Sequence, residues 1–229
     1  MRIVFVFLIA CSLLFSCNSS DKSPDVSGIK VELSSRRFEQ DLFKLDTANF
    51  TTNFDQLLAK YPSFGENYLS AILNADPKWS ADSAADYVTG FITAYKPVYD
   101  SAQKVFKDFD KYEKEIKQAL QFVKHYFPAY KDRKQIITYI GPLDGYGDIL
   151  SDDAIIIGLQ HHLGKSFSLY RSALVQETYP EYISNRFEPD YIPVNCMQNI
   201  MNDLYPEKID DKPLVQQMVE KGKRLFLLS

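Results

Sequence analysis

Ile136-Ile137-Thr138-Tyr139-Ile140 decides the fold class, because its β-branched and aromatic residues favour a strand in a chain otherwise dominated by helical spacing. A second strand is predicted at Ala154-Ile155-Ile156-Ile157. Its residues are apolar on both faces, which is typical of a strand inside a sheet. The turn signals Gly141-Pro142 and Asp144-Gly145 lie between the two strands.

Apolar residues outside these strands mostly recur at helical spacing. A short strand is expected over 29–33 and a helix or turn over 36–43. Helices are predicted over 50–61, 64–73, 84–95, 98–127, 193–204 and 214–225, with a break near Pro97 and short helices between Gly158 and Pro189. Gly222 is expected to allow a close helix–helix contact. The fold class is therefore α+β, mainly helical with a small sheet.

The N-terminus predicts a lipoprotein precursor. Arg2 precedes an apolar run over 3–15, which has the length of a signal-peptide core and is too short to cross a bilayer. Leu14-Phe15-Ser16-Cys17 has the lipobox pattern, in which the cysteine becomes the acylated first residue. We expect a signal peptide over 1–16, a polar tether over 17–27 and one domain over 28–229. An uncleaved anchor, or a secretory signal with a chance cysteine, is the alternative.

Composition narrows the function classes. The 229-residue chain has a net charge of −4, so no basic footprint for nucleic acid is expected. Once Cys11 leaves with the signal peptide and Cys17 is acylated, Cys196 is a lone thiol that cannot form an internal disulfide. Stability must then come from the core, and no cofactor is predicted.

The histidines are the first candidates for chemistry. His161 and His162 are adjacent, and adjacent side chains point in different directions in a strand or a helix. Chelation of one metal ion by both rings is therefore disfavoured, and we expect one packed ring and one exposed ring. His125 is expected to make a partly buried polar contact.

The remaining candidates are a cysteine and a group of aspartates. Cys196 lies among apolar residues of a predicted helix, where a buried, inert thiol is expected. Asp144, Asp148, Asp152 and Asp153 offer oxygen ligands for calcium. Their spacing is not that of an EF-hand, which favours a solvated acidic turn.

Several short motifs occur in a fixed order along the chain. They are Cys17, Arg37-Phe38-Glu39-Gln40-Asp41-Leu42-Phe43, Tyr61-Pro62-Ser63-Phe64, Lys124-His125-Tyr126-Phe127-Pro128, Ile155-Ile156-Ile157-Gly158-Leu159, Leu163-Gly164 and Glu220-Lys221-Gly222-Lys223. Together they resemble the GldB family, the gliding-motility-associated lipoproteins of Bacteroidetes. Family members commonly carry an Asp-Met-Tyr type of sequence where this chain has Gln160-His161-His162, so the resemblance assigns no role there. Members usually continue further, so we expect a copy that is short at its C-terminus.

GldB-like proteins resemble, more distantly, predicted zinc peptidases of the zincin type. The resemblance implies a degenerate zincin-like domain, with Gln198, Asn199 and Asn202 at the positions of the metal-binding helix. Lys221 takes the place of the metal-binding glutamate. Amides are poor zinc ligands and Asn199 cannot act as a base, so these are vestigial positions and no metal is expected.

The resemblance implies a non-enzymatic accessory or structural lipoprotein of the cell envelope, held in membrane lipid through Cys17. Its implied partners are proteins of the gliding machinery and of the associated secretion apparatus. Two alternatives stay open. One is a metal-dependent peptidase with an unusual site at His161-His162, which bound zinc would support. The other is a periplasmic ligand-binding lipoprotein, which an aromatic-lined pocket would support.

Overall fold

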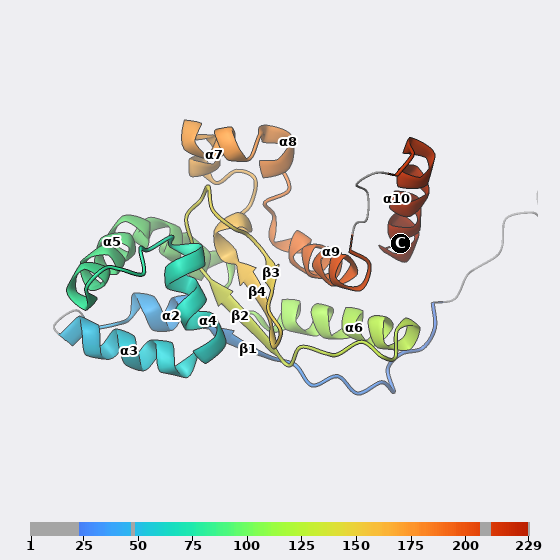
Figure 1. Ribbon diagram of the computed structural model, residues 1–229, viewed down its shortest axis with the longest axis horizontal. Helices are drawn as coiled ribbons and strands as arrows, with labels where there is room; N and C mark the ends of the chain where they lie inside the picture. Colours follow the sequence, from blue (N-terminus) through green and yellow to red (C-terminus); the bar gives the residue numbers. More distant parts are fainter. Residues whose placement is uncertain (1–22, 47–48, 207–211, 229) are drawn as a thin grey trace, which may run out of the picture.

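The computed structural model describes residues 23–46, 49–206 and 212–228. Helices surround a small sheet in this part of the chain (Figure 1). The first elements are β1 (Ser34–Arg37), α2 (Phe38–Phe43), α3 (Phe50–Lys60), α4 (Pro62–Asn67), the π-helical turn η2 (Tyr68–Ile72), α5 (Ala81–Val105) and α6 (Asp110–Tyr126). The others are β2 (Gln135–Tyr139), β3 (Ile149–Leu150), β4 (Ala154–Gly158), η3 (Leu159–His161), η4 (Ser168–Arg171), α7 (Ala173–Thr178), α8 (Glu181–Ser184), η5 (Pro189–Tyr191), α9 (Ile192–Leu204) and α10 (Leu214–Leu228). The predicted mainly helical α+β fold is confirmed.

The sheet has the strand order β1-β2-β4-β3. Strands β1, β2 and β4 are parallel, and β3 runs antiparallel to β4. Every residue of β4 is buried, as is β2 beyond Gln135. Both strands predicted from apolar runs are therefore confirmed, including the internal position of the second.

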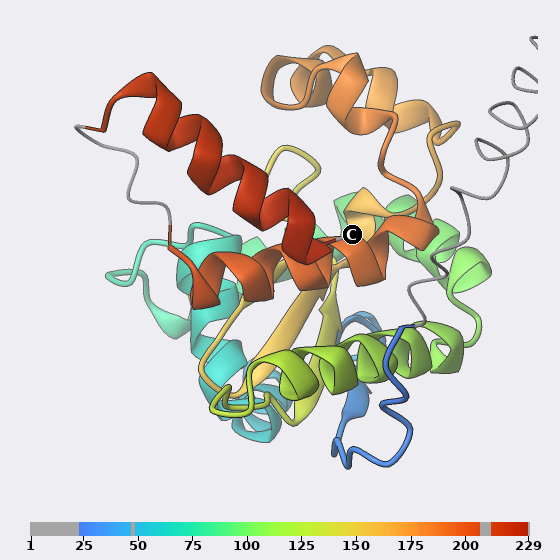
Figure 2. The same cartoon turned by 90° about the vertical axis from the view of Figure 1, so that its right-hand side faces the viewer.

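Helices cover both faces of the sheet. Helices α6 and α9 pack together on the face turned to the viewer in Figure 2, and α3, α4 and α5 lie behind the sheet in that view. An aromatic cluster joins this second group to β2: the ring of Phe64 lies 4.9 Å from that of Phe38 and 5.7 Å from that of Tyr139. All three rings are buried. The sheet is thus enclosed, and its carboxyl edge is where the connecting loops meet.

The first strand begins later than predicted. Residues 29–33 form no strand, and pairing starts with Ser34 opposite Gln135. Side chains of α6 hold the preceding segment instead: Nε2 of Gln121 donates to the carbonyl of Ile29 at 2.8 Å, and Nζ of Lys124 donates to the carbonyl of Lys30 at 3.2 Å. This segment is therefore held beside α6 and does not pair in the sheet.

Two expectations for the helices were wrong. Helix α5 continues through Pro97 without a break. The proline removes one backbone donor, but Pro97 and Thr93, one turn earlier, are both exposed, so water can reach the freed carbonyl group. Gly222 makes no close helix–helix contact, because it is exposed and a Cβ atom built there meets no atom within 4 Å.

Candidate functional site

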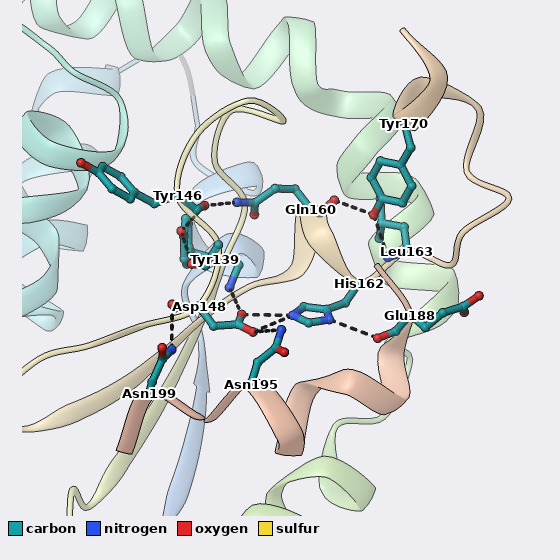
Figure 3. A network of polar contacts seen from close by, with 12 residues as sticks. Tyr139, Tyr146, Asp148, Gln160, His162, Leu163, Tyr170, Glu188, Asn195 and Asn199 are labelled. Carbon is teal, nitrogen blue, oxygen red and sulfur yellow. Dashed lines mark hydrogen bonds and ion pairs between the residues drawn. The ribbon is translucent and has the colours of Figure 1, made fainter. Parts of the chain in front are cut away.

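A polar network lies where the chain leaves β2 and β4. In parallel strands the carboxyl ends meet at one edge of the sheet, which is where open α/β sheets place their sites. The loop after β2 supplies Asp148, and the segment after β4 supplies His162. Helix α9 adds Asn195 and Asn199 from below, as Figure 3 shows.

The carboxylate of Asp148 is the centre of this network. Its Oδ2 atom lies 2.9 Å from Nε2 of His162 and accepts a hydrogen bond from Nδ2 of Asn195 at 3.0 Å. Its Oδ1 atom accepts from the backbone N–H of Gly158 at 3.1 Å. The main-chain carbonyl of Asp148 accepts from Nδ2 of Asn199 at 2.8 Å. Both carboxylate oxygens are therefore occupied by donors of the protein itself.

The surroundings of His162 favour its imidazolium form. Its Nδ1 atom lies 3.2 Å from the carbonyl oxygen of Glu188, so both ring nitrogens face oxygens that can only accept while Asp148 is ionised. Burial alone lowers the pKa of His162, but the charge and hydrogen bonds of Asp148 outweigh it, and the pKa rises above 6.5. Burial likewise opposes ionisation of Asp148, yet His162, Asn195 and Gly158 lower its pKa below 3.8.

His161, in contrast, has a neutral ring. Its Nε2 atom lies 2.9 Å from the carbonyl oxygen of Leu143, and its ring stacks on Phe187 with centroids 4.5 Å apart. Burial lowers its pKa to about 4, so the ring is neutral at pH 7. The two adjacent histidines are thus both buried, and the expected exposed ring was wrong. The expected partly buried contact at His125 was also wrong, because that residue is exposed.

Buried amide and phenol groups tie the same loops together. Gln160 accepts from the backbone N–H of Gly141 at 3.1 Å and donates to the carbonyl of Tyr146 at 2.8 Å. The hydroxyl of Tyr139 lies 2.7 Å from the carbonyl oxygen of Tyr146, and that of Tyr170 donates to the carbonyl of Gln160 at 2.6 Å. These bonds fix the loop after β2 to the segment after β4 (Figure 3).

A second buried network lies at the end of β1, within the motif 37–43. Glu39 is fully buried at the start of α2. Its Oε1 atom lies 2.6 Å from Nε of Arg37, and its Oε2 atom accepts from the hydroxyl of Thr138 at 2.7 Å. Arg37 also donates to the carbonyl of Phe106 at 3.1 Å. This carboxylate therefore fixes α2 to β2 and Arg37 to the end of α5.

The hydrogen-bonding atoms of Asp148 and His162 all contact groups of the protein itself. A general base would need one of these atoms within hydrogen-bond reach of its substrate. Within residues 23–46, 49–206 and 212–228, no three side chains of His, Cys, Asp and Glu converge as a metal site. The site joins loops and a helix through a buried ion pair.

A groove elsewhere on the described surface has different chemistry. It has a volume of about 580 Å³ and is lined by Val31, Glu32, Leu33, Ser34, Arg36, Lys117, Lys134 and Gln135. Polar and charged side chains dominate this lining, and it contains no aromatic residue. It therefore does not supply the aromatic pocket that a ligand-binding lipoprotein would use.

Of the vestigial metal positions, Asn199 alone joins the buried network. Gln198, Asn202 and Lys221 are exposed on α9 and α10. The two amides of α9 that reach Asp148 are Asn195 and Asn199, which have the i, i+4 spacing of one helix face. Sequence reasoning missed Asn195. The signal that could have found it is its i, i+4 spacing from Asn199, beside the apolar stripe of α9. The vestigial assignment stays a prediction.

The remaining candidates are the cysteine and the aspartates of the predicted acidic turn. Cys196 is fully buried, as predicted, and burial raises the pKa of its thiol well above the usual range. Asp152 and Asp153 are exposed, and Asp153 accepts from the hydroxyl of Ser63 at 2.9 Å. The side chain of Asp148 is only 3% exposed, so the expectation of a solvated acidic turn was wrong for that residue.

Cys17, the signal peptide 1–16 and tether residues 17–22 lie outside the described residues. The described end of the predicted tether includes Val26, which is 5% exposed. In the described part of the chain, no helix combines the length and apolar character needed to cross a bilayer.

Comparison with known proteins identifies one relationship. A family model described as "Gliding motility protein GldB" matches residues 19–229. The resemblance inferred from the ordered motifs is thereby confirmed. No curated protein and no solved structure shows significant similarity to the chain.

Proposed function

Because the chain belongs to the gliding motility protein GldB family, we propose that it is a lipid-anchored, non-enzymatic accessory lipoprotein of the cell envelope that works with the gliding machinery. The family match over residues 19–229 is the observation that carries this proposal. The associated secretion apparatus is the second set of partners that we propose.

The sequence around Cys17 supports the anchor. Leu14-Phe15-Ser16-Cys17 follows an apolar run of signal-peptide length and precedes a polar segment. Each buried CH₂ of an attached acyl chain contributes about 0.8 kcal/mol, so several chains hold a protein on a membrane almost permanently. Attachment through Cys17 would keep the domain beside the envelope.

The buried network supports the absence of an enzymatic role. Both ring nitrogens of His162, Nε2 of His161 and the carboxylate of Asp148 contact partners inside the protein. Cys196 is buried, and its raised pKa keeps it in the unreactive thiol form. These are four of the described groups that sequence analysis named as candidates for chemistry, and their positions favour a structural role.

Deletion and complementation test the proposal. We expect deletion of the gene to abolish surface gliding, the intact gene to restore it, and Cys17→Ala to fail at equal protein abundance. Mass spectrometry of protein from native membranes should find acyl chains on Cys17. Normal gliding and envelope secretion in the deletion strain would overturn the proposed role, and an unmodified Cys17 would overturn the anchor.

Metal analysis decides between this proposal and a peptidase. Protein purified without chelators should contain far less than one zinc ion per chain. Stoichiometric zinc that disappears in a His161→Ala/His162→Ala variant, measured on folded protein, would instead support a metal-dependent peptidase.

A further inference from the structure

Between Leu214 and Arg224, helix α10 has its apolar side chains exposed. Leu214, Val215, Met218 and Val219 are 51% to 71% exposed. In the same stretch, 214–224, the half-buried side chains are polar: they are Gln217 and Arg224, and Arg224 donates to the carbonyl of Tyr205 just after α9. A surface helix of a globular protein normally has the reverse orientation.

Two lysines border this apolar face. At 3.6 residues per turn, Leu214, Met218, Val215 and Val219 span an arc of about 140°. Lys221 lies just beyond one border of the arc, and Lys223 lies beyond the other. Long basic side chains on both borders of an apolar face are typical of a helix that lies in a membrane interface, with its charges at the headgroups.

The charge of the helix favours a lipid surface over a second copy of the chain. Between Leu214 and Arg224 the helix has three basic residues and one acidic residue, Glu220, in a chain with a net charge of −4. Packing two copies face to face in parallel would bring the bordering lysines of both copies together. An anionic bilayer instead offers negative headgroups to those lysines and an apolar layer between them.

The position of α10 agrees with the proposed anchor. The described chain begins at the end of the molecule that carries α10, and both are on the right in Figure 1 and toward the viewer in Figure 2. An anchor upstream of residue 23 would therefore hold this end of the domain near the membrane. This step rests on the proposed function.

We infer that α10 is a second membrane contact, with Leu214, Val215, Met218 and Val219 in the interface of an anionic bilayer and Lys221 and Lys223 at its headgroups. The acyl chains hold the protein on the membrane, and α10 fixes the orientation of the domain on it.

A fluorescent probe on the helix tests this inference. The full protein from native membranes, with its anchor, is placed in vesicles of phosphatidylethanolamine and phosphatidylglycerol. An environment-sensitive dye is attached to Met218→Cys or, as matched controls, to Gln216→Cys on the same helix and Tyr182→Cys in α8. We expect a blue shift, several-fold brighter emission and quenching by lipid-embedded quenchers at position 218 only.

Charge-reversal variants identify the cause of the shift. Lys221→Glu/Lys223→Glu should remove the signal at 218, whereas Lys114→Glu/Lys117→Glu on α6 should leave it unchanged.

Water-like emission at 218 in protein that stays on the vesicles through an alkaline wash would overturn the membrane contact but keep the anchor. Loss of the protein in that wash would overturn the anchor. In that case the emission at 218 before the wash still tests the membrane contact of α10. Apolar emission without lipid, together with disulfide cross-linking between 218 positions, would assign the face to a second copy instead.

Discussion

The Oδ2 atom of Asp148 lies 2.9 Å from Nε2 of His162, and the two side chains are only 3% and 1% exposed. This ion pair joins the loop after β2 to the segment after β4, and Asn195 connects it to α9. A buried pair of charges is costly to break, because removing one partner leaves the other uncompensated. The pair therefore fixes the carboxyl edge of the sheet.

Removing the histidine should strongly destabilise the fold. In His162→Leu the buried carboxylate of Asp148 loses its counter-charge, and we expect a loss of about 3–5 kcal/mol in the free energy of unfolding. Urea unfolding followed by circular dichroism measures it. The matched control is Asp100→Asn in the exposed Lys96–Asp100 pair, which should cost at most about 1 kcal/mol. Equal losses in both variants would contradict a structural role for the buried pair.

His161 should make the protein sensitive to acid. Its pKa falls from 6.5 in the unfolded chain to about 4 in the folded one, which corresponds to about 3 kcal/mol. This stability is present above pH 6.5 and is lost as the pH falls toward 4, because only the unfolded chain takes up the proton in that window. Unfolding free energies measured across this window should fall steeply in the natural protein and much less in His161→Gln. Parallel curves would show that another group is responsible.

His162 should produce the opposite dependence at higher pH. Its folded pKa is raised above 6.5, so its contribution is fully present below pH 6.5 and is lost as the pH rises through the raised pKa. We expect maximal stability near neutral pH, with a decline on the alkaline side that is absent in His162→Gln. NMR titration of the His162 ring provides an independent check, and a pKa below 6.5 would contradict the imidazolium assignment.

Two glycines should respond oppositely to alanine. A Cβ atom at Gly158 would lie 2.8 Å from Nε2 of the buried Gln160 and 3.1 Å from the carbonyl oxygen of Gly147, so Gly158→Ala should cost roughly 1–3 kcal/mol. Gly222 has open space around it within a helix, so Gly222→Ala should stabilise by up to about 1 kcal/mol. Thermal unfolding of both variants distinguishes these signs, and a destabilised Gly222→Ala would mean that α10 packs closely on a neighbour.

The strands and longer helices were predictable because their signals are local. The apolar runs that became β2 and β4, and the stripe that became α9, each give a repeated pattern within one segment. The two residues of β3 are too few to show any period. Residues 29–33 show the right alternation but lack a partner strand, a condition that only the tertiary structure sets.

The buried network could not be predicted in the same way. Asp148 and Asn195 are 47 positions apart, and their meeting depends on α9 packing across the carboxyl edge of the sheet. For the adjacent histidines, the expectation of one exposed ring was wrong. The segment from 164 to 191 supplies Phe187 to His161 and the carbonyl of Glu188 to His162, and nothing local to the histidines indicates that cover.

Gliding by cells that carry Asp148→Asn/His162→Gln tests the central claim most directly. The two amides can keep hydrogen bonds but cannot exchange protons at neutral pH, so the variant removes acid–base chemistry from the site. At a temperature where the variant is folded, and at matched abundance, we predict a gliding speed indistinguishable from that of the natural protein. Clearly slower gliding by cells with the folded variant at matched abundance would contradict the non-enzymatic account.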